Sequence, residues 1–237
     1  MIATIINAVL VVAGGLIGAL FGNRISEKYT KTIMTVMSLV TVVIGVQNAI
    51  GTSDILIIVV CLVVGTIIGT ALRIDDRLNN SGEIIKKKLK NTKLAGGKVA
   101  DAFVTTSILF CVGSMTVVGS IQAGLNKDYG MLLTKSVMDF VASIAFASAF
   151  GGLGVILSSL TVLVVQGSIT LLASVMAPLL TAQVITEVSA VGGAMFIGMA
   201  INMLGLREEK IKVGDMLPAI ILPIVYIPVA ELLVKLI

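Results

Sequence analysis

Residues 2–21 read IATIINAVLVVAGGLIGALF and contain no charged side chain. A run of about 20 apolar residues is the length that an α-helix needs to cross the hydrocarbon of a bilayer. The run lacks the basic start and small-residue cleavage site of a secretory signal peptide, so we expect it to stay as a first membrane span. This stretch predicts a membrane protein built from helices.

The composition of the whole chain supports that prediction. Of its 237 residues 57% are hydrophobic and 13% charged, whereas a soluble domain has about 25% charged residues. The alternating segments of an outer-membrane barrel are not seen, so the spans should be helices. We expect an all-α polytopic membrane helix bundle that forms one integral membrane domain over residues 1–237.

Seven further apolar runs follow the first. They cover residues 33–50, 55–72, 100–124, 131–150, 153–172, 182–204 and 217–236. About eight transmembrane helices are therefore predicted. A run beside Gly151-Gly152 or Pro178 could instead be re-entrant, which would leave seven crossings.

The basic residues predict the orientation of these spans. Fourteen of the 17 Lys and Arg residues fall in three loops on one side, at residues 24–31, 73–98 and 207–212. Because cytoplasmic loops carry an excess of Lys and Arg, this side should be cytoplasmic, with both termini outside. Within the arm at 73–98, apolar Ile84, Ile85 and Leu89 recur at helical spacing beneath basic residues, which indicates an interfacial helix. The arm should therefore dock on the lipid bilayer, and no nucleic acid partner is expected.

Enzyme chemistry is disfavoured by the residue types. The chain has no His, and its two thiols, Cys61 and Cys111, lie inside apolar runs. Imidazole metal sites and Ser-His or Cys-His nucleophile pairs are therefore excluded. Lys135 and Ser136 are adjacent and point about 100° apart on a helix, which is poor geometry for a dyad. We expect no enzyme activity and no cofactor.

The fourth span is the most unusual stretch. Seven of the twelve residues from 113 to 124 are small or polar, namely Gly113, Ser114, Thr116, Gly119, Ser120, Gln122 and Gly124. They begin near the bilayer midplane, where a helix interrupted by glycine can expose backbone groups to a solute. Close helix packing is the alternative explanation.

The sixth span carries a similar patch at a similar depth. Its residues are Gln166, Gly167, Ser168 and Thr170. Ser and Thr hydroxyls can bond to their own helix, whereas a glutamine amide needs another partner. We therefore expect one or two discontinuous Gly/Ser-rich spans, with the second break near Gly167.

Among the ionisable residues in the predicted spans, the candidates for function are Lys135, Asp139 and Glu187, whereas Asp101 and Glu231 lie near span ends, where capping or snorkelling explains them. Such residues are rare in membranes and mark functional sites by default. Asp139 lies about 12 Å into its helix. We expect it to face the fourth span as a cation or proton site, with Lys135 or Glu187 as its partner. The alternative for Lys135 is that its side chain reaches the outer surface.

Short glycine patterns suggest weak internal repeats. Gly14-x-x-x-Gly18 and Gly65-x-x-x-Gly69 lie 51 residues apart, and Gly113-Ser-Met-Thr resembles Gly167-Ser-Ile-Thr. We expect the first two patterns to pack helices closely. They could also support a homo-oligomer.

These polar segments carry a family resemblance. Residues 110–125 (FCVGSMTVVGSIQAGL), 135–139 (KSVMD), 145–148 (AFAS) and 166–170 (QGSIT) resemble the YqgA/YdfK-like family of uncharacterised bacterial multi-spanning membrane proteins. The resemblance covers essentially the whole chain. It implies placement in the bacterial inner membrane and one structural unit, and it names no substrate.

The leading hypothesis is a transporter or channel for a small polar or ionic solute, with a site at the midplane between spans four, five and six. The alternative is a non-catalytic membrane scaffold or regulatory protein. A shared hydrated cavity at the polar patches would favour transport, and a dry helix interface would favour the scaffold.

Overall fold

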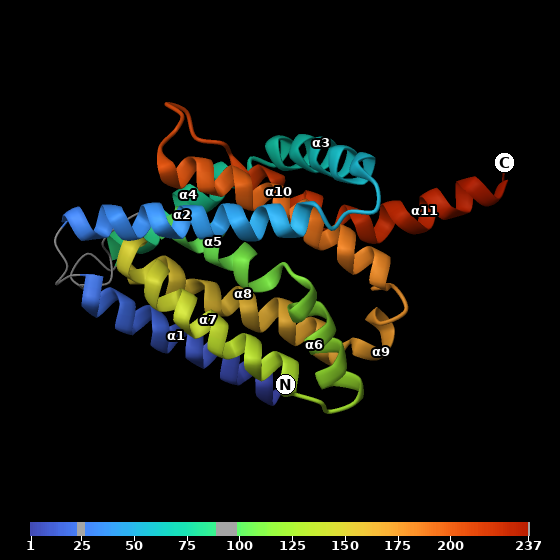
Figure 1. Ribbon diagram of the computed structural model, residues 1–237, viewed down its shortest axis with the longest axis horizontal. Helices are drawn as coiled ribbons and strands as arrows, with labels where there is room; N and C mark the ends of the chain where they lie inside the picture. Colours follow the sequence, from blue (N-terminus) through green and yellow to red (C-terminus); the bar gives the residue numbers. More distant parts are fainter. Residues whose placement is uncertain (23–26, 89–98, 237) are drawn as a thin grey trace.

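The computed structural model describes residues 1–22, 27–88 and 99–236. Every regular element in these ranges is a helix (Figure 1). The elements are α1 (Ile2–Gly22), α2 (Glu27–Ala49), α3 (Ile55–Ala71), α4 (Ile74–Lys88), α5 (Val99–Cys111), α6 (Ser114–Leu125), α7 (Gly130–Phe150), α8 (Gly152–Leu171), α9 (Ala173–Met176), α10 (Ala182–Leu204), the 3-10 helix η1 (Val213–Ile220) and α11 (Leu222–Leu236). The prediction of an all-α bundle is confirmed.

The eight predicted spans correspond to these helices. Five helices, α1, α2, α7, α8 and α10, are long and apolar enough to cross a membrane unaided. Three bent pairs bring the number to as many as eight: α3 with α4 at 54°, α5 with α6 at 57°, and η1 with α11 at 43°. The chain is a polytopic helix bundle.

The fourth span is interrupted where its glycines cluster. Helix α5 ends at Cys111, and Gly113 has φ 156° and ψ 151°, a conformation that side-chain-bearing residues rarely adopt. Helix α6 starts at Ser114 in a new direction. The predicted break at this position is confirmed.

The sixth span is continuous, so the expected second break near Gly167 is wrong. Helix α8 runs from Gly152 to Leu171 without interruption. An unbroken ladder satisfies every backbone group of the segment within apolar surroundings, and one glycine does not force it to end. The Gly-Ser-x-Thr motif thus has a different geometry in each of its two copies.

Glycines bring the helices into close contact, as predicted for the Gly-x-x-x-Gly patterns. A Cβ added at Gly18 of α1 would lie 2.3 Å from the carbonyl oxygen of Ile144 in α7. A Cβ at Gly69 of α3 would lie 1.9 Å from the carbonyl oxygen of Asp215 in η1. Both faces are thus packed within the chain, and a homo-oligomer would have to use other surfaces.

The helices form two groups that lie side by side (Figure 1). In one group α1 lies along α7 and α8, with α5 and α6 against α8. In the other α2 packs on α10, and α3 packs on η1. Helix α11 extends beyond the rest of the molecule towards the C-terminus (Figure 1).

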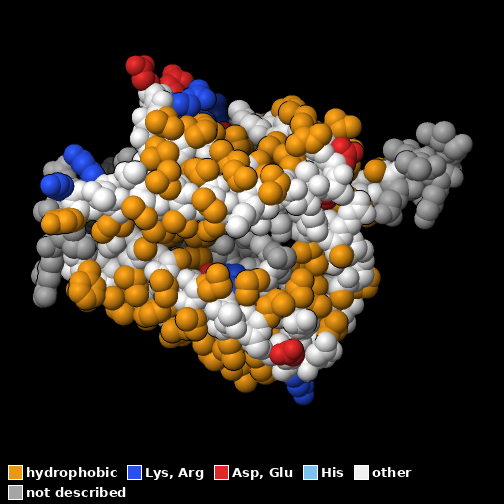
Figure 2. Space-filling view, in the orientation of Figure 1, with side chains coloured by type: hydrophobic (Ala, Val, Ile, Leu, Met, Phe, Trp, Pro, Cys, Tyr) orange, Lys and Arg blue, Asp and Glu red, His pale blue; other side chains and the backbone are white. Residues whose placement is uncertain are grey.

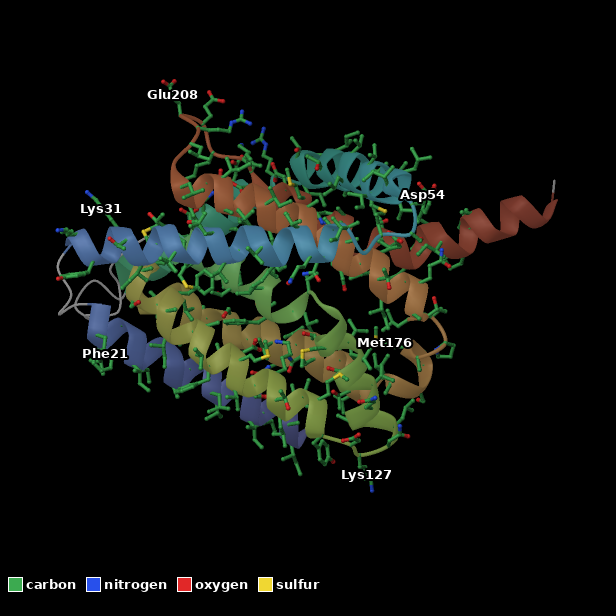
Figure 3. All side chains as sticks on the ribbon, viewed as in Figure 1. Phe21, Lys31, Asp54, Lys127, Met176 and Glu208 are labelled. Atoms are coloured by element: carbon green, nitrogen blue, oxygen red, sulfur yellow. The ribbon has the colours of Figure 1, made fainter. Side chains whose placement is uncertain are left out.

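The connections alternate between two ends of the molecule. Phe21, Lys31 and Glu208 lie at one end, while Asp54, Lys127 and Met176 lie towards the opposite end (Figure 3). This alternation matches the predicted order of crossings.

The surface between the two ends is rich in apolar side chains. Large hydrophobic residues are exposed along α1, α2 and α3, among them Ile5, Val9, Leu39, Val43, Val63 and Ile67. Most of the charged side chains visible in Figure 2 lie near the edges of the outline. So large an apolar surface is unusual for a protein in water and suits contact with lipid.

The basic arm at 73–98 begins with α4, which an ion pair and hydrogen bonds join to η1 and to Lys212 just before it. Lys212 binds Asp76 at 3.1 Å, and the Gly214 amide donates to the Asp75 carboxylate at 3.0 Å. Leu89 and Lys90 of the predicted interfacial helix lie outside the described residues, as do the side chains of 85–88. The interfacial position of the arm stays a prediction.

Candidate functional site

A buried ion pair lies on α7. Lys135 and Asp139 are one helical turn apart, and each is 6% exposed. The Lys135 ammonium donates to Asp139 Oδ2. The same ammonium lies 5.8 Å from the centroid of the Phe110 ring in α5, which is within range of a cation–π contact. Lys135 therefore points into the bundle and not to the outer surface.

Asn7 of α1 joins this pair to α8. Its Nδ2 donates to Asp139 Oδ2 at 2.9 Å and to Gln166 Oε1 at 3.2 Å. Asn7 and Gln166 are both fully buried. One side chain thus connects α1, α7 and α8 through polar atoms.

The pattern of α1 explains why Asn7 lies there. Gly14 and Gly18 follow Asn7 by seven and eleven residues, a spacing that places all three on one face of the helix. The two glycines bring that face against the backbone of α7 at Phe140 and Ile144. The Asn7 amide is therefore held against α7, where Asp139 lies.

Several buried polar atoms on α7 and on helices packed near it have no hydrogen-bond partner within the part of the chain that the structure describes. These buried atoms come from α1, α6, α7 and α8: Thr4 Oγ1, Asn7 Oδ1, Ser120 Oγ, Ser143 Oγ, Gln166 Nε2 and Thr170 Oγ1. A buried polar group without a partner costs about 1–3 kcal/mol. Native proteins rarely keep several such groups without a water, an ion or a ligand to satisfy them.

The break in the fourth span lies beside the pair. The Thr116 hydroxyl donates to the carbonyl oxygen of Phe110 at 3.0 Å, across the break. Phe110, next to the last residue of α5, places its ring centroid 5.8 Å from the Lys135 ammonium. The interruption of the helix and the ion pair therefore belong to one site.

A largely apolar cavity of about 470 Å³ borders the same break. Its wall is formed by α5, α6, α8, α9, α10, η1 and α11 and includes Cys111, Val117, Val165, Ile169, Val188 and Ile224. Its polar part contains Ser107, whose hydroxyl donates to Thr161 at 3.0 Å, and Ser168. Cys111, which lines this cavity, directly follows Phe110, whose ring faces the Lys135 ammonium.

Three other predicted residues make no hydrogen bond with the ion pair in the described part of the chain. Glu187 of α10 is fully buried and accepts hydrogen bonds from the Thr52 hydroxyl at 2.6 Å and from the Ser53 amide and hydroxyl, both at 2.7 Å. Glu187 thus stabilises the turn between α2 and α3. Its hydrogen-bond partners are Thr52 and Ser53 rather than Asp139. Gln122 is partly exposed near the α6–α7 turn, and Ser168 is exposed.

The remaining predicted residues lie at the break, on α6 or on α8. Gly113 forms the break, and a Cβ at Gly119 would meet Leu132 of α7 at 3.4 Å. Gly167 lies within α8, and the side chain of Ser114 lies outside the described residues. In the described ranges 1–22, 27–88 and 99–236, no group of three His, Cys, Asp or Glu side chains is arranged to hold a metal ion.

Sequence reasoning missed Asn7, the residue that connects the site. The available signal was an amide side chain within the first apolar run, where a polar group needs a partner. The sequence does not show which helix supplies that partner, so the link from Asn7 to Asp139 and Gln166 could not be predicted.

Comparisons with known proteins identify the family. The family model described as "Protein of unknown function (DUF554)" matches residues 2–228. The chain belongs to this family. DUF554 relatives include the uncharacterized membrane protein YdfK of Bacillus subtilis (strain 168), 32% identical over 231 residues, with 96% of each chain covered. The uncharacterized protein YqgA of Escherichia coli (strain K12) is 25% identical over 224 residues, with 94% of each chain covered.

No solved structure matches the chain. The resemblance to YdfK and YqgA inferred from the polar segments is confirmed. With its apolar helices and its membrane-protein relative, this DUF554 member is a multi-pass membrane protein.

Proposed function

We propose that this DUF554 protein is a membrane transporter or channel for a small polar or ionic solute. The site lies between the broken fourth span (α5 and α6), α7 and α8, with α1 contributing Asn7. The observation that supports this most is the buried Lys135–Asp139 pair, which Asn7 joins to Gln166, both side chains carrying a buried polar atom that lacks a partner in the described structure. Intramembrane ionisable groups beside an interrupted helix are typical of solute and ion pathways.

The pair is a poor device for stability alone. Lys precedes Asp on the helix, which is the weaker order for an i,i+4 pair. Replacing a buried ion pair with apolar residues is often neutral or stabilising. A role in binding explains its presence better.

We further propose that the protein lies in the bacterial inner membrane, with the basic arm cytoplasmic and both termini outside. The support is the placement of most Lys and Arg residues in loops of one side. In this orientation Lys135 and Asp139 lie in the outer half of α7.

Flux measurements test the transport proposal. Purified protein in liposomes would be screened with labelled inorganic ions and small metabolites, and Asp139→Asn compared with wild type. We expect the wild type to move one or more of these solutes and Asp139→Asn to lose that flux. The matched control is Asp128→Asn, which changes an exposed aspartate in the α6–α7 turn. Full flux in Asp139→Asn would refute the assigned site.

A membrane scaffold or regulator is the second candidate. The full burial of Asn7 and Gln166 favours it, because a dry polar interface can simply hold helices together. Thiol labelling of Gln166→Cys separates the two functions. Reaction with a small water-soluble thiol reagent supports a hydrated site, and protection under all solute conditions supports the scaffold.

A further inference from the structure

We propose that the solute of the Lys135–Asp139 site is a small zwitterion with an aliphatic side chain, of which an α-amino acid is the simplest form. This inference rests on the proposed transport function and names its class of substrate. The solute's carboxylate would take Lys135, and its ammonium would take Asp139.

The charge of the site supports a zwitterion. Lys135 and Asp139 neutralise each other, and the polar side chains around them, such as Asn7, Gln166 and Ser143, are uncharged. A simple cation or anion would leave a net charge in a region of low dielectric, where an uncompensated charge is costly. A zwitterion keeps the site neutral.

The hydrogen-bonding groups match such an exchange. When a zwitterion enters, each member of the pair replaces its partner with the opposite charge of the solute, so neither is left unpaired. The unpartnered Asn7 Oδ1 is an acceptor suited to an ammonium, and the unpartnered Gln166 Nε2 is a donor suited to a carboxylate. Both atoms are fully buried, and both belong to side chains already bonded into the site.

The neighbouring cavity suggests the nature of the solute's side chain. Its volume of about 470 Å³ exceeds the size of any aliphatic side chain, and its wall consists mainly of Val, Ile and Leu. Cys111 lines this cavity and directly follows Phe110, whose ring lies 5.8 Å from the Lys135 ammonium. A solute whose charged end occupies the pair can therefore direct an aliphatic group past Cys111 into apolar surroundings.

Binding of three matched probes tests the proposal. The probes are L-valine, 3-methylbutanoate, which lacks the amine, and 2-methylpropylamine, which lacks the carboxylate. Binding would be measured by calorimetry on the full chain in lipid nanodiscs. We expect wild type to bind L-valine at least about tenfold more tightly than either analogue, and more tightly than glycine.

Single variants should change the preference in opposite directions. Asp139→Asn leaves Lys135 without a counter-charge and should prefer 3-methylbutanoate. Lys135→Met leaves Asp139 and should prefer 2-methylpropylamine. The exposed Asp128→Asn and Lys127→Met undergo the same chemical changes and should keep the wild-type order.

The wild-type measurement decides the proposal even if a variant does not fold. Tightest binding of 2-methylpropylamine, Na⁺ or K⁺ would make the pair a cation site and overturn the zwitterion, while flux of that cation would leave the transport function standing. Wild type that binds none of the three probes also overturns it. Equal affinity for glycine and L-valine would overturn the assignment of the cavity.

Discussion

Asn7 is the side chain on which the geometry of the site depends. Its single amide group holds Asp139 of α7 and Gln166 of α8 at 2.9 and 3.2 Å. Without it, Lys135 would be the one side-chain partner left to the carboxylate in the described part of the chain, and Gln166 Oε1 would lose the hydrogen bond that it accepts. The residue therefore fixes how three helices present their polar groups.

Replacement of Asn7 by leucine should weaken the fold and abolish the function. Interhelical hydrogen bonds in membranes contribute about 0.5–2 kcal/mol, so we expect Asn7→Leu to lower the free energy of unfolding by that amount. Denaturant titration in micelles measures it, with the exposed Asn126→Leu as the control. An Asn7→Leu protein with unchanged stability and flux would show that the bridge is unimportant.

Helices α6 and α8 show how the same four-residue pattern can give two structures. Gly113 precedes α6 at φ 156°, in open space, whereas Gly167 lies inside α8. A Cβ at Gly167 would meet only Met1 Cε at 3.6 Å, an ordinary contact. The requirement for glycine is therefore conformational at 113 and absent at 167.

Matched alanine variants test this difference. Gly113→Ala should lower the free energy of unfolding by about 1–3 kcal/mol, because the residue is held in a region that favours glycine. Gly167→Ala should raise it by about 0.5–1 kcal/mol, because alanine is the better helix former. Thermal unfolding of both variants provides the comparison. Equal effects would contradict the assignment of a broken fourth span and a continuous sixth.

Much of the architecture could be predicted from the sequence because lipid imposes simple rules. Apolar runs of about 20 residues predicted the spans, and the glycines and hydroxyls at 113–120 predicted the break. The prediction of a break at Gly167 was wrong. Composition alone does not show whether backbone groups released by a break would find hydrogen-bond partners on a neighbouring helix.

The site was predictable only in part. The rarity of charge and amide groups in membranes pointed to Lys135, Asp139 and Gln166. The residue types do not show which helices pack against one another, so the sequence did not reveal the partners of these side chains. Glu187 was a predicted partner of Asp139. Because α10 packs on α2, Glu187 instead accepts hydrogen bonds from Thr52 and Ser53 in the turn after α2.

At the scale of the whole molecule, the loops divide between two ends that should lie on opposite sides of the membrane. Lys127 and Glu208 are exposed and lie at different ends (Figure 3). We expect Lys127→Cys to react with an impermeant thiol reagent in intact cells, and Glu208→Cys to react only after permeabilisation. The background would lack Cys61 and Cys111, both of which are buried. The reverse labelling pattern would invert the proposed topology.

The most direct test of the account compares Asp139→Asn, Lys135→Met and the double variant for both stability and solute uptake in liposomes. A binding site predicts that Asp139→Asn still folds but loses uptake, whichever residue occupies position 135. A purely structural pair predicts that the double variant is more stable than either single variant, because breaking a buried pair costs about 3–5 kcal/mol and removing both charges does not. Full uptake by folded Asp139→Asn would contradict the claim that Asp139 binds the solute.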